Sequence, residues 1–206
     1  MNLMPDRAYP MGTVRSLLAS DRVTPATAEA LRRRLLGARP PDEEVFDADA
    51  YRTLEAVCAR LIPQPDRYPP IDVAAELHRR LADGIGDGWR YVDLPPDRIA
   101  YVRGIVGIDQ TSAALFGEPF LTLAGANRDT VLRALQAGVA DGETWRTMKS
   151  DCFFEELLAQ VVDIYYAHPL AQEEIGYVGM ADARGWQAIG LDERDAHEPA
   201  PLGTSR

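Results

Sequence analysis

The segment from about Glu143 to Ala167 constrains the fold most strongly, because it is apolar on most sides and has helical spacing. In its apolar part, Glu156, Gln160 and Asp163 form a narrow polar stripe. Its apolar residues are Phe153, Phe154, Leu157, Leu158, Val161, Val162, Ile164 and Tyr165. A helix that is apolar over most of its circumference belongs inside a bundle. The sequence therefore predicts an all-α fold, with about six helices around this long central C-terminal helix.

Local signals predict five further helices before this one. The first begins with Thr24 as N-cap and Pro25 at the first helical position, and Gly37 ends it. The second begins after another N-cap, Asp47, and ends at Pro63. The remaining three are expected at about 71–81, from 97 to about 115, and at about 127–139. No alternating strand pattern of convincing length is present, so no sheet is expected.

The fourth of these helices contains two glycines, Gly104 and Gly107. Each weakens a helix by about 1 kcal/mol relative to alanine, so their presence predicts a close approach by a neighbouring element. The inner positions of the fourth helix are predicted to include Ile99, Val102, and either Ile105 or Val106. Those of the fifth helix are predicted to be Val131, Leu132, Leu135 and Val139.

These signals divide the chain into three parts. Residues 1–23 are expected to form an irregular N-terminal arm, and residues 24–167 the helical bundle domain. Residues 168–206 are expected to form an irregular arm rich in glycine and aromatic residues, followed by an acidic tail.

The composition excludes several classes of partner. The 206 residues carry a net charge of −10 with a pI of about 4.8, whereas binding to nucleic acid requires a basic face. An anionic membrane surface is disfavoured for the same reason. No apolar run approaches the roughly 18 residues that a membrane-spanning helix needs, so no direct membrane span is expected.

Candidates for cofactor and metal binding are sparse. His78, His168 and His197 lie far apart, and none has a second ligand at metal-binding spacing. His78 stands beside two arginines and is expected at the surface. Cys58 and Cys152 occupy apolar-face positions, which favours buried thiols. The chain is therefore expected to bind no flavin, haem or metal of its own.

Catalytic candidates are equally few. Glu156 and Asp163 share a helix face and could act as an acid/base pair, or they could solvate the polar stripe of a buried helix. The second interpretation is favoured. Neither a nucleophile elbow nor a cysteine–histidine pair is present, so nucleophilic catalysis has no candidate. The alternative hypothesis is a self-standing acid/base enzyme that acts on a sugar through Glu156 and Asp163, or through His168.

The segment that follows the apolar helix, YYAHPLAQEEIGYVGMADARGWQAIG from Tyr165 to Gly190, mixes aromatics with glycines. Large amphipathic side chains of this kind are enriched at protein interfaces, and glycine allows sharp turns and close backbone contact. Either the segment binds a partner, or it covers its own bundle. The predicted partner-interface residues are Tyr165, Tyr166, His168, Tyr177 and Trp186.

The same segment carries a family resemblance. A Phe-Phe-containing helix that runs into YYxHP, then a GYxG turn, then GWxxIG, resembles the gluconate 2-dehydrogenase subunit 3 family. The resemblance also covers the second helix and the junction Phe120-Leu121-Thr122-Leu123, so it spans about residues 46–190.

This resemblance implies a non-catalytic small subunit of a flavin-dependent sugar or polyol dehydrogenase of the glucose–methanol–choline type. The large flavoprotein subunit would hold the FAD, and a cytochrome c subunit often takes the electrons onward. Small subunits of this kind support assembly, and many carry a twin-arginine export signal. No such signal is visible here, since Arg32-Arg33-Arg34 is followed by only two leucines. A membrane-associated or periplasmic complex exported by the partner's signal is favoured, and a cytoplasmic one is the alternative.

Overall fold

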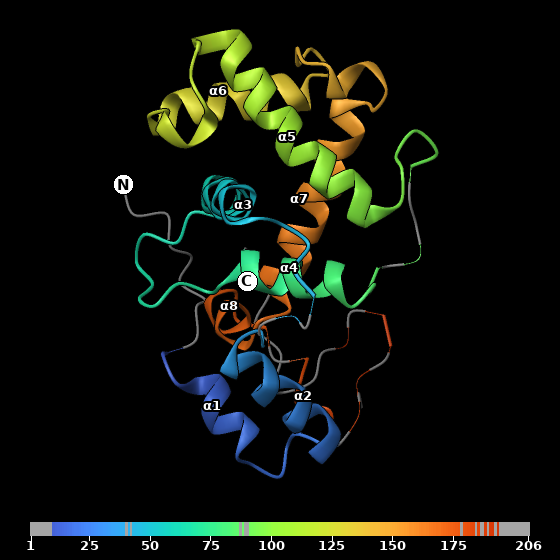
Figure 1. Cartoon of the computed structure of the whole chain (residues 1–206). Helices are drawn as coiled ribbons and strands as arrows, with labels where there is room; N and C mark the ends of the chain where they lie inside the picture. Colours follow the sequence, from blue (N-terminus) through green and yellow to red (C-terminus); the bar gives the residue numbers. More distant parts are fainter. Residues whose placement is uncertain are drawn as a thin grey trace. The chain divides into compact units, whose positions relative to one another are not determined.

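The computed structural model describes residues 10–39, 41, 43–86, 88, 91–177, 179–183, 185, 188, 190, 191 and 193. Over these residues the chain folds into eight α-helices and no strand, which confirms the predicted all-α class (Figure 1). The helices are α1 (Thr13–Leu18), α2 (Pro25–Leu36), α3 (Ala48–Leu61), α4 (Val73–Ala82), α5 (Asp97–Phe116), α6 (Gly125–Gln136), α7 (Ser150–Tyr166) and α8 (Pro169–Glu174). Two short 3₁₀ turns, Phe120–Thr122 and Thr144–Arg146, precede α6 and α7.

The predicted helix boundaries are confirmed where local signals set them. Pro25 is the first residue of α2, and the Thr24 side chain accepts a hydrogen bond from the Thr27 N–H. The Asp47 carboxylate accepts from two first-turn N–H groups of α3. Gly37 ends α2 with a positive φ of 81°, a conformation that favours glycine.

The chain separates into two compact units. The first contains the described residues up to Gly37 together with those from Tyr166 onward, and the second runs from Ala38 to Tyr165. The boundaries of these units, at Gly37 and Tyr166, differ from the expected boundaries at residues 23 and 167. Part of the N-terminal segment expected to be irregular also forms a helix, α1.

In the first unit, α1 and α2 pack with α8. Their apolar core consists of Val14, Leu18, Val23, Ala28, Leu31 and Met180, the last supplied by the C-terminal segment. Gly12, the N-cap of α1, has no side chain to accept hydrogen bonds from the first helical turn. The buried Glu173 of α8 takes this role, because its two carboxylate oxygens accept from the N–H groups of Gly12 and Val14 at 2.9 Å each.

A second polar anchor joins the C-terminal segment to the start of α2. The Asp182 carboxylate accepts from the Thr24 N–H at 2.7 Å, the Thr24 hydroxyl at 2.8 Å and the Thr27 hydroxyl at 2.6 Å. The hydrogen bond from the Thr24 backbone is the largest cause that lowers the pKa of Asp182 from 3.8 to about 2. The first unit is therefore assembled from segments about 160 residues apart in sequence.

In the second unit, α3 to α7 enclose a larger core in which α5 contributes most of the close packing. The prediction of a close approach at the two α5 glycines is confirmed. A Cβ at Gly104 would lie 2.1 Å from the Phe153 ring of α7, and one at Gly107 would lie 2.4 Å from the Trp145 ring. Phe153 also meets Tyr101 of α5 edge-on, with ring centroids 5.6 Å apart.

Three expectations about the helices were wrong in detail. Ile105 is buried on α5, but Ile99 and Val102 are not, so the inner row is shifted. Val139 lies beyond the end of α6 and is 71% exposed. The apolar C-terminal helix begins at Ser150, after the 3₁₀ turn at Thr144–Arg146, and α5 is the longer helix. No described helix is both long enough and apolar enough to cross a membrane.

Candidate functional site

The outer face of α5 carries an apolar stripe that is partly exposed to solvent. The side chains of Ile99, Val102 and Val106 are 51%, 39% and 49% exposed. They are spaced three and four residues apart along the helix. Residues so spaced lie on one helix face. Ile105 and Ile108 of the same helix point in other directions and are buried in the core. A surface helix normally presents polar residues outward, so α5 is apolar on two sides. We call Ile99, Val102 and Val106 the α5 stripe.

A shallow hollow of about 330 Å³ lies beside this stripe. Its lining residues are Arg103, Gln110, Glu143, Thr144, Arg146 and Thr147. Arg103 and Gln110 are one helical turn from Val106, so the hollow continues the stripe along α5. The opposite wall is the 3₁₀ turn and the residue after it. Arg103 donates to the Thr147 hydroxyl, and the Thr144 N–H donates to Gln110 Oε1 at 2.9 Å, so both walls are held together. We call it the arginine hollow.

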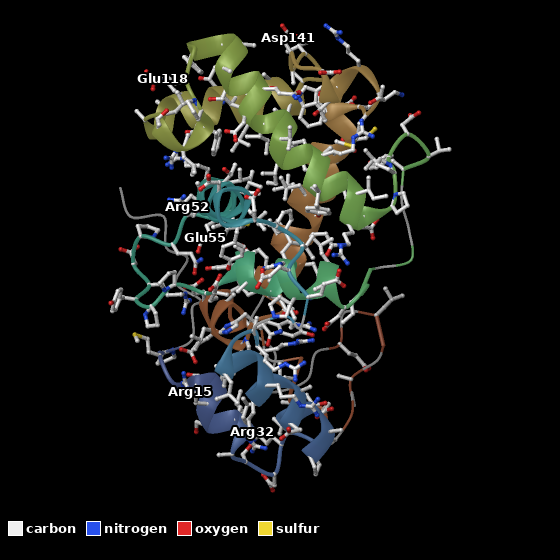
Figure 2. All side chains as sticks on the ribbon, viewed as in Figure 1. Arg15, Arg32, Arg52, Glu55, Glu118 and Asp141 are labelled. Carbon is white, nitrogen blue, oxygen red and sulfur yellow. The ribbon has the colours of Figure 1, made fainter. Side chains whose placement is uncertain are left out.

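The two arginines of this hollow form no ion pair with any carboxylate in the described part of the chain. Other arginines of the same unit are paired, for example Arg60 with Asp129 at 2.7 Å and Arg98 with Glu43 at 2.7 Å. Charged side chains are spread over both units; those labelled in Figure 2 are all exposed. In a chain of net charge −10, the arginine hollow is thus a local cationic site next to an apolar one.

Sequence reasoning missed this surface because it assigned Ile99 and Val102 to the core. The signal was present: α5 has more apolar positions than one helix face can hold, and two of them, Ile105 and Val106, are adjacent. Adjacent residues point about 100° apart on a helix, so both cannot lie at the centre of one buried face. The choice between them was left open, and the structure buries Ile105.

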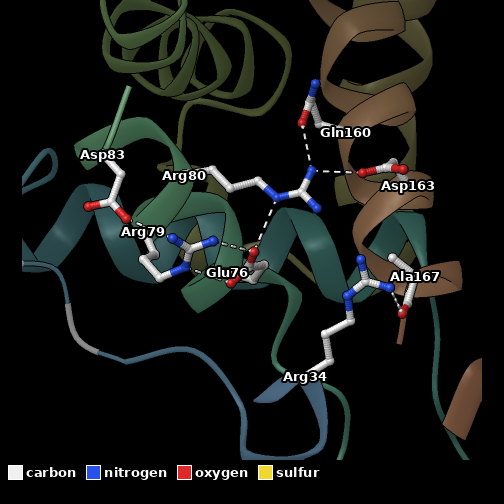
Figure 3. A network of polar contacts seen from close by, with 8 residues as sticks. All are labelled: Arg34, Glu76, Arg79, Arg80, Asp83, Gln160, Asp163 and Ala167. Carbon is white, nitrogen blue, oxygen red and sulfur yellow. Dashed lines mark hydrogen bonds and ion pairs between the residues drawn. The ribbon is translucent and has the colours of Figure 1, made fainter. Parts of the chain in front are cut away.

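The acid/base candidate Asp163 is part of a polar network between α4 and α7 (Figure 3). Arg80 Nη1 donates to Asp163 Oδ2 at 2.7 Å, and Arg80 Nε donates to Glu76 Oε1 at 3.1 Å. Arg79 holds both oxygens of Glu76, at 2.7 and 2.9 Å. Burial acts to raise the pKa of Glu76, but the hydrogen bonds from Arg79 and Arg80 outweigh it, and the net pKa is lowered. Asp163 is therefore engaged as a structural ion-pair partner.

The other member of the candidate pair, Glu156, is only 7% exposed. The expectation that it solvates an exposed stripe of α7 was wrong, because the packing of the second unit covers that part of the helix. Gln160 Nε2 lies 3.5 Å from Glu156 Oε1, at the limit of a hydrogen bond. Asp163, one helical turn further on, is exposed. The two carboxylates thus occupy different environments on one helix.

His168 and His78 have structural roles in their contacts, and His197 lies outside the described residues. His168 is the N-cap of α8, where its Nδ1 accepts from the Leu170 N–H at 3.2 Å. His78 was expected at the surface, but it is 5% exposed. Its ring lies 5.4 Å from that of Phe46 and 5.3 Å from that of Tyr51, and Nε2 accepts from the Val45 N–H at 3.0 Å. Helix α4 turns this position inward, although both of its neighbours in sequence are arginines.

The four predicted interface residues that the structure describes, Tyr165, Tyr166, His168 and Tyr177, differ in exposure. Tyr165 is buried at 7% exposure, whereas Tyr166 and Tyr177 are 41% and 49% exposed. Trp186 lies outside the described residues. The Tyr177 ring lies against Gly179, where an added Cβ would fall 2.1 Å from the tyrosine oxygen. The exposed tyrosines remain candidates for contact with a partner.

Neither thiol nor metal chemistry is indicated by the described geometry. Cys58 is buried and unbridged, and burial is the main cause that raises its pKa to about 12. Cys152 is only partly buried, so the prediction of two buried thiols holds for Cys58 alone. Within the described residues, no group of three or more histidine, cysteine, aspartate or glutamate side chains is placed to hold a metal.

The family model of gluconate 2-dehydrogenase subunit 3 matches residues 48–191, which is more than half of the chain. Neither the curated proteins nor the solved structures provided a match. The matched range begins with α3 and contains the α5 stripe, the arginine hollow and all five predicted interface residues. A family of subunits implies a dehydrogenase complex of several chains, as the sequence motifs predicted. The chain therefore belongs to the gluconate 2-dehydrogenase subunit 3 family.

Proposed function

We propose that this chain is the non-catalytic small subunit of an FAD-dependent sugar or polyol dehydrogenase complex. Its role is to support the assembly, stability or export of the flavoprotein subunit, a protein of the glucose–methanol–choline type. Membership of the gluconate 2-dehydrogenase subunit 3 family is the observation that carries this proposal. The FAD belongs to the partner, a cytochrome c subunit is a further candidate member, and this chain binds no cofactor of its own.

The contacts of the acid/base candidates support a structural role. Asp163 is paired with Arg80, and His168 uses its Nδ1 to cap α8. A general base must hold a free lone pair within hydrogen-bond reach of its substrate. Asp163 instead joins α7 to α4, and His168 caps α8. The alternative, a self-standing acid/base enzyme that acts on a sugar, therefore has less support.

The location of the complex follows from its partner in this proposal. A flavoprotein subunit with an export signal would carry this chain to the periplasm, and a partner without one would keep it in the cytoplasm. The half-exposed Tyr166 and Tyr177, with Trp186, are proposed to contribute to the contact.

Co-expression with the flavoprotein subunit encoded beside this chain tests the proposal. We expect the two proteins to elute together in gel filtration at a fixed ratio, with flavin absorbance in the shared peak. The flavoprotein expressed alone is the control, and it should be less soluble or less saturated with FAD. Two proteins that elute separately at micromolar concentration would contradict a permanent subunit role.

A second measurement addresses the enzyme alternative. The purified chain alone, mixed with sugars and an electron-accepting dye or assayed for hydrolysis products, is expected to show no turnover. Turnover that disappears in Glu156→Gln or Asp163→Asn would instead establish an active site on α7.

A further inference from the structure

We propose that the α5 stripe and the arginine hollow together form the surface that docks the flavoprotein subunit. This inference rests on the proposed function and adds to it the residues of contact and the chemistry of the partner's surface. The partner segment is predicted to present apolar side chains to Ile99, Val102 and Val106, and a carboxylate to Arg103 and Arg146.

Helix α5 carries apolar side chains both on a buried side and on an exposed side. Burial of Ile105 and Ile108 already accounts for the attachment of α5 to its own core. The three stripe residues are only partly buried and leave apolar surface in water, which is unfavourable. Contiguous apolar patches with a polar rim mark interaction sites on soluble proteins. Arg103 and Gln110 supply such a rim along the same helix.

The arginine hollow contains two arginines, Arg103 and Arg146, that form no ion pair within the described residues. Arg103 donates to the Thr147 hydroxyl, a neutral acceptor, and no ion pair or hydrogen bond involves the Arg146 side chain in the described region. An arginine fork is suited to a carboxylate, which it can bind through two parallel hydrogen bonds. Glu143 also lines the hollow but forms no ion pair with either arginine. An acidic side chain from outside the chain would complete this arrangement.

Net charge disfavours a second copy of this chain as the occupant of this surface. Two copies would each bring a net charge of −10, and their mutual repulsion opposes association. A stable contact needs about 800 Å² from each partner, more than three half-exposed side chains provide. The α5 stripe would therefore form the centre of a larger contact, with the arginine hollow at its edge.

The test measures the affinity of the full-length chain for the flavoprotein subunit by biolayer interferometry. Val106→Asp places an unpaired charge in the proposed apolar centre, and we expect it to weaken binding by about a hundredfold or more. Val139→Asp is the matched control, since it makes the same change at an exposed valine that belongs neither to the α5 stripe nor to the lining of the arginine hollow, and binding should be unchanged.

A second pair of variants tests the arginine hollow. Arg146→Glu should weaken binding by about tenfold or more and reduce its dependence on salt. Arg15→Glu on α1 makes the same change in the other unit and should have no effect. Because all four positions are exposed, thermal melting of each free variant should match that of the unaltered chain, which separates lost docking from lost folding.

The outcomes distinguish the two proposals. If the unaltered chain does not bind the flavoprotein, the proposed function fails. If it binds and both Val106→Asp and Arg146→Glu bind equally well, the subunit role stands and this docking surface is wrong. Self-association of the free chain in sedimentation equilibrium that Val106→Asp abolishes, with flavoprotein binding unchanged, would assign the surface to a second copy and overturn the inference.

Discussion

At the scale of single residues, His78 shows how burial selects one protonation state. Its Nε2 accepts from the Val45 N–H, which requires that nitrogen to carry no proton. Glu44 Oε2 lies 3.5 Å from the same nitrogen and would favour a proton there. Burial outweighs the attraction of exposed Glu44, and the net pKa of His78 is lowered from 6.5. The neutral imidazole is therefore the folded form at neutral pH.

This lowered pKa makes stability depend on pH. The unfolded chain binds a proton at His78 more readily than the folded chain, so stability is complete above about pH 6.5 and falls as the solution becomes more acidic. We expect the unfolding free energy, measured with urea, to decrease from about pH 7.5 to about pH 5, and His78→Gln to remove part of that decrease.

A charge variant provides the control for this prediction. Glu44→Gln removes the group that raises the pKa of His78, so it should steepen the acid-side loss of stability. Parallel stability profiles for the unaltered chain and His78→Gln would show that other groups govern the pH dependence.

At the scale of secondary-structure elements, α5 depends on two residues that normally weaken helices. Gly104 and Gly107 remove side chains where Phe153 and Trp145 pack. Trp145 is fixed by its indole N–H, which donates to the Thr111 hydroxyl of α5 at 2.8 Å. The intrinsic cost of each glycine, about 1 kcal/mol, is thereby offset by aromatic burial.

Gly104→Ala tests this packing. The added methyl would lie 2.1 Å from the Phe153 ring, so we expect a net loss of about 1–3 kcal/mol despite the better helix propensity of alanine. Urea unfolding of Gly104→Ala, Phe153→Leu and the double variant forms a complete cycle. The smaller leucine should leave room for the methyl, so the double variant should be more stable than the sum of the single effects predicts. Additive losses would contradict a direct clash.

At the scale of the whole molecule, the first unit is discontinuous in sequence. Helices α1 and α2 come from the N-terminal end, whereas α8, Met180 and Asp182 come from beyond residue 165. The C-terminal segment supplies a core side chain, the carboxylate at the start of α1 and the carboxylate at the start of α2. Neither α1 (6 residues) nor α2 (12 residues) is long enough to be stable as an isolated helix in water.

Truncation after Ala167 should therefore unfold the N-terminal helices as well. We expect the backbone amides of α1 and α2 to lose protection in hydrogen exchange, while those of α3 to α6 keep it. The full-length variant Glu173→Gln serves as comparison, because it weakens only the contact with the first turn of α1. Retained protection of α1 and α2 after truncation would show that their own contacts suffice.

Local chemistry determined both boundaries of α2 and the start of α3. Thr24, Pro25, Asp47 and Gly37 act through hydrogen bonds and backbone angles within a few residues of themselves, so the sequence alone was enough to predict them. The all-α class followed from apolar spacing, which is also local. The family followed from short motifs, and the family model confirms it.

Tertiary structure alone decided which apolar face of α5 is buried and which groups meet across the sequence. Val106 and Ile105 are equally apolar, so only the position of neighbouring helices could select Ile105 for the core. His78 and Glu156 are polar by composition, yet both are buried because the surrounding elements cover them. Glu173 accepts a hydrogen bond at the start of α1, about 160 residues away in sequence. The spacing of apolar residues does not predict a contact of this kind. Burial depends on distances between elements, and sequence spacing describes only distances within one.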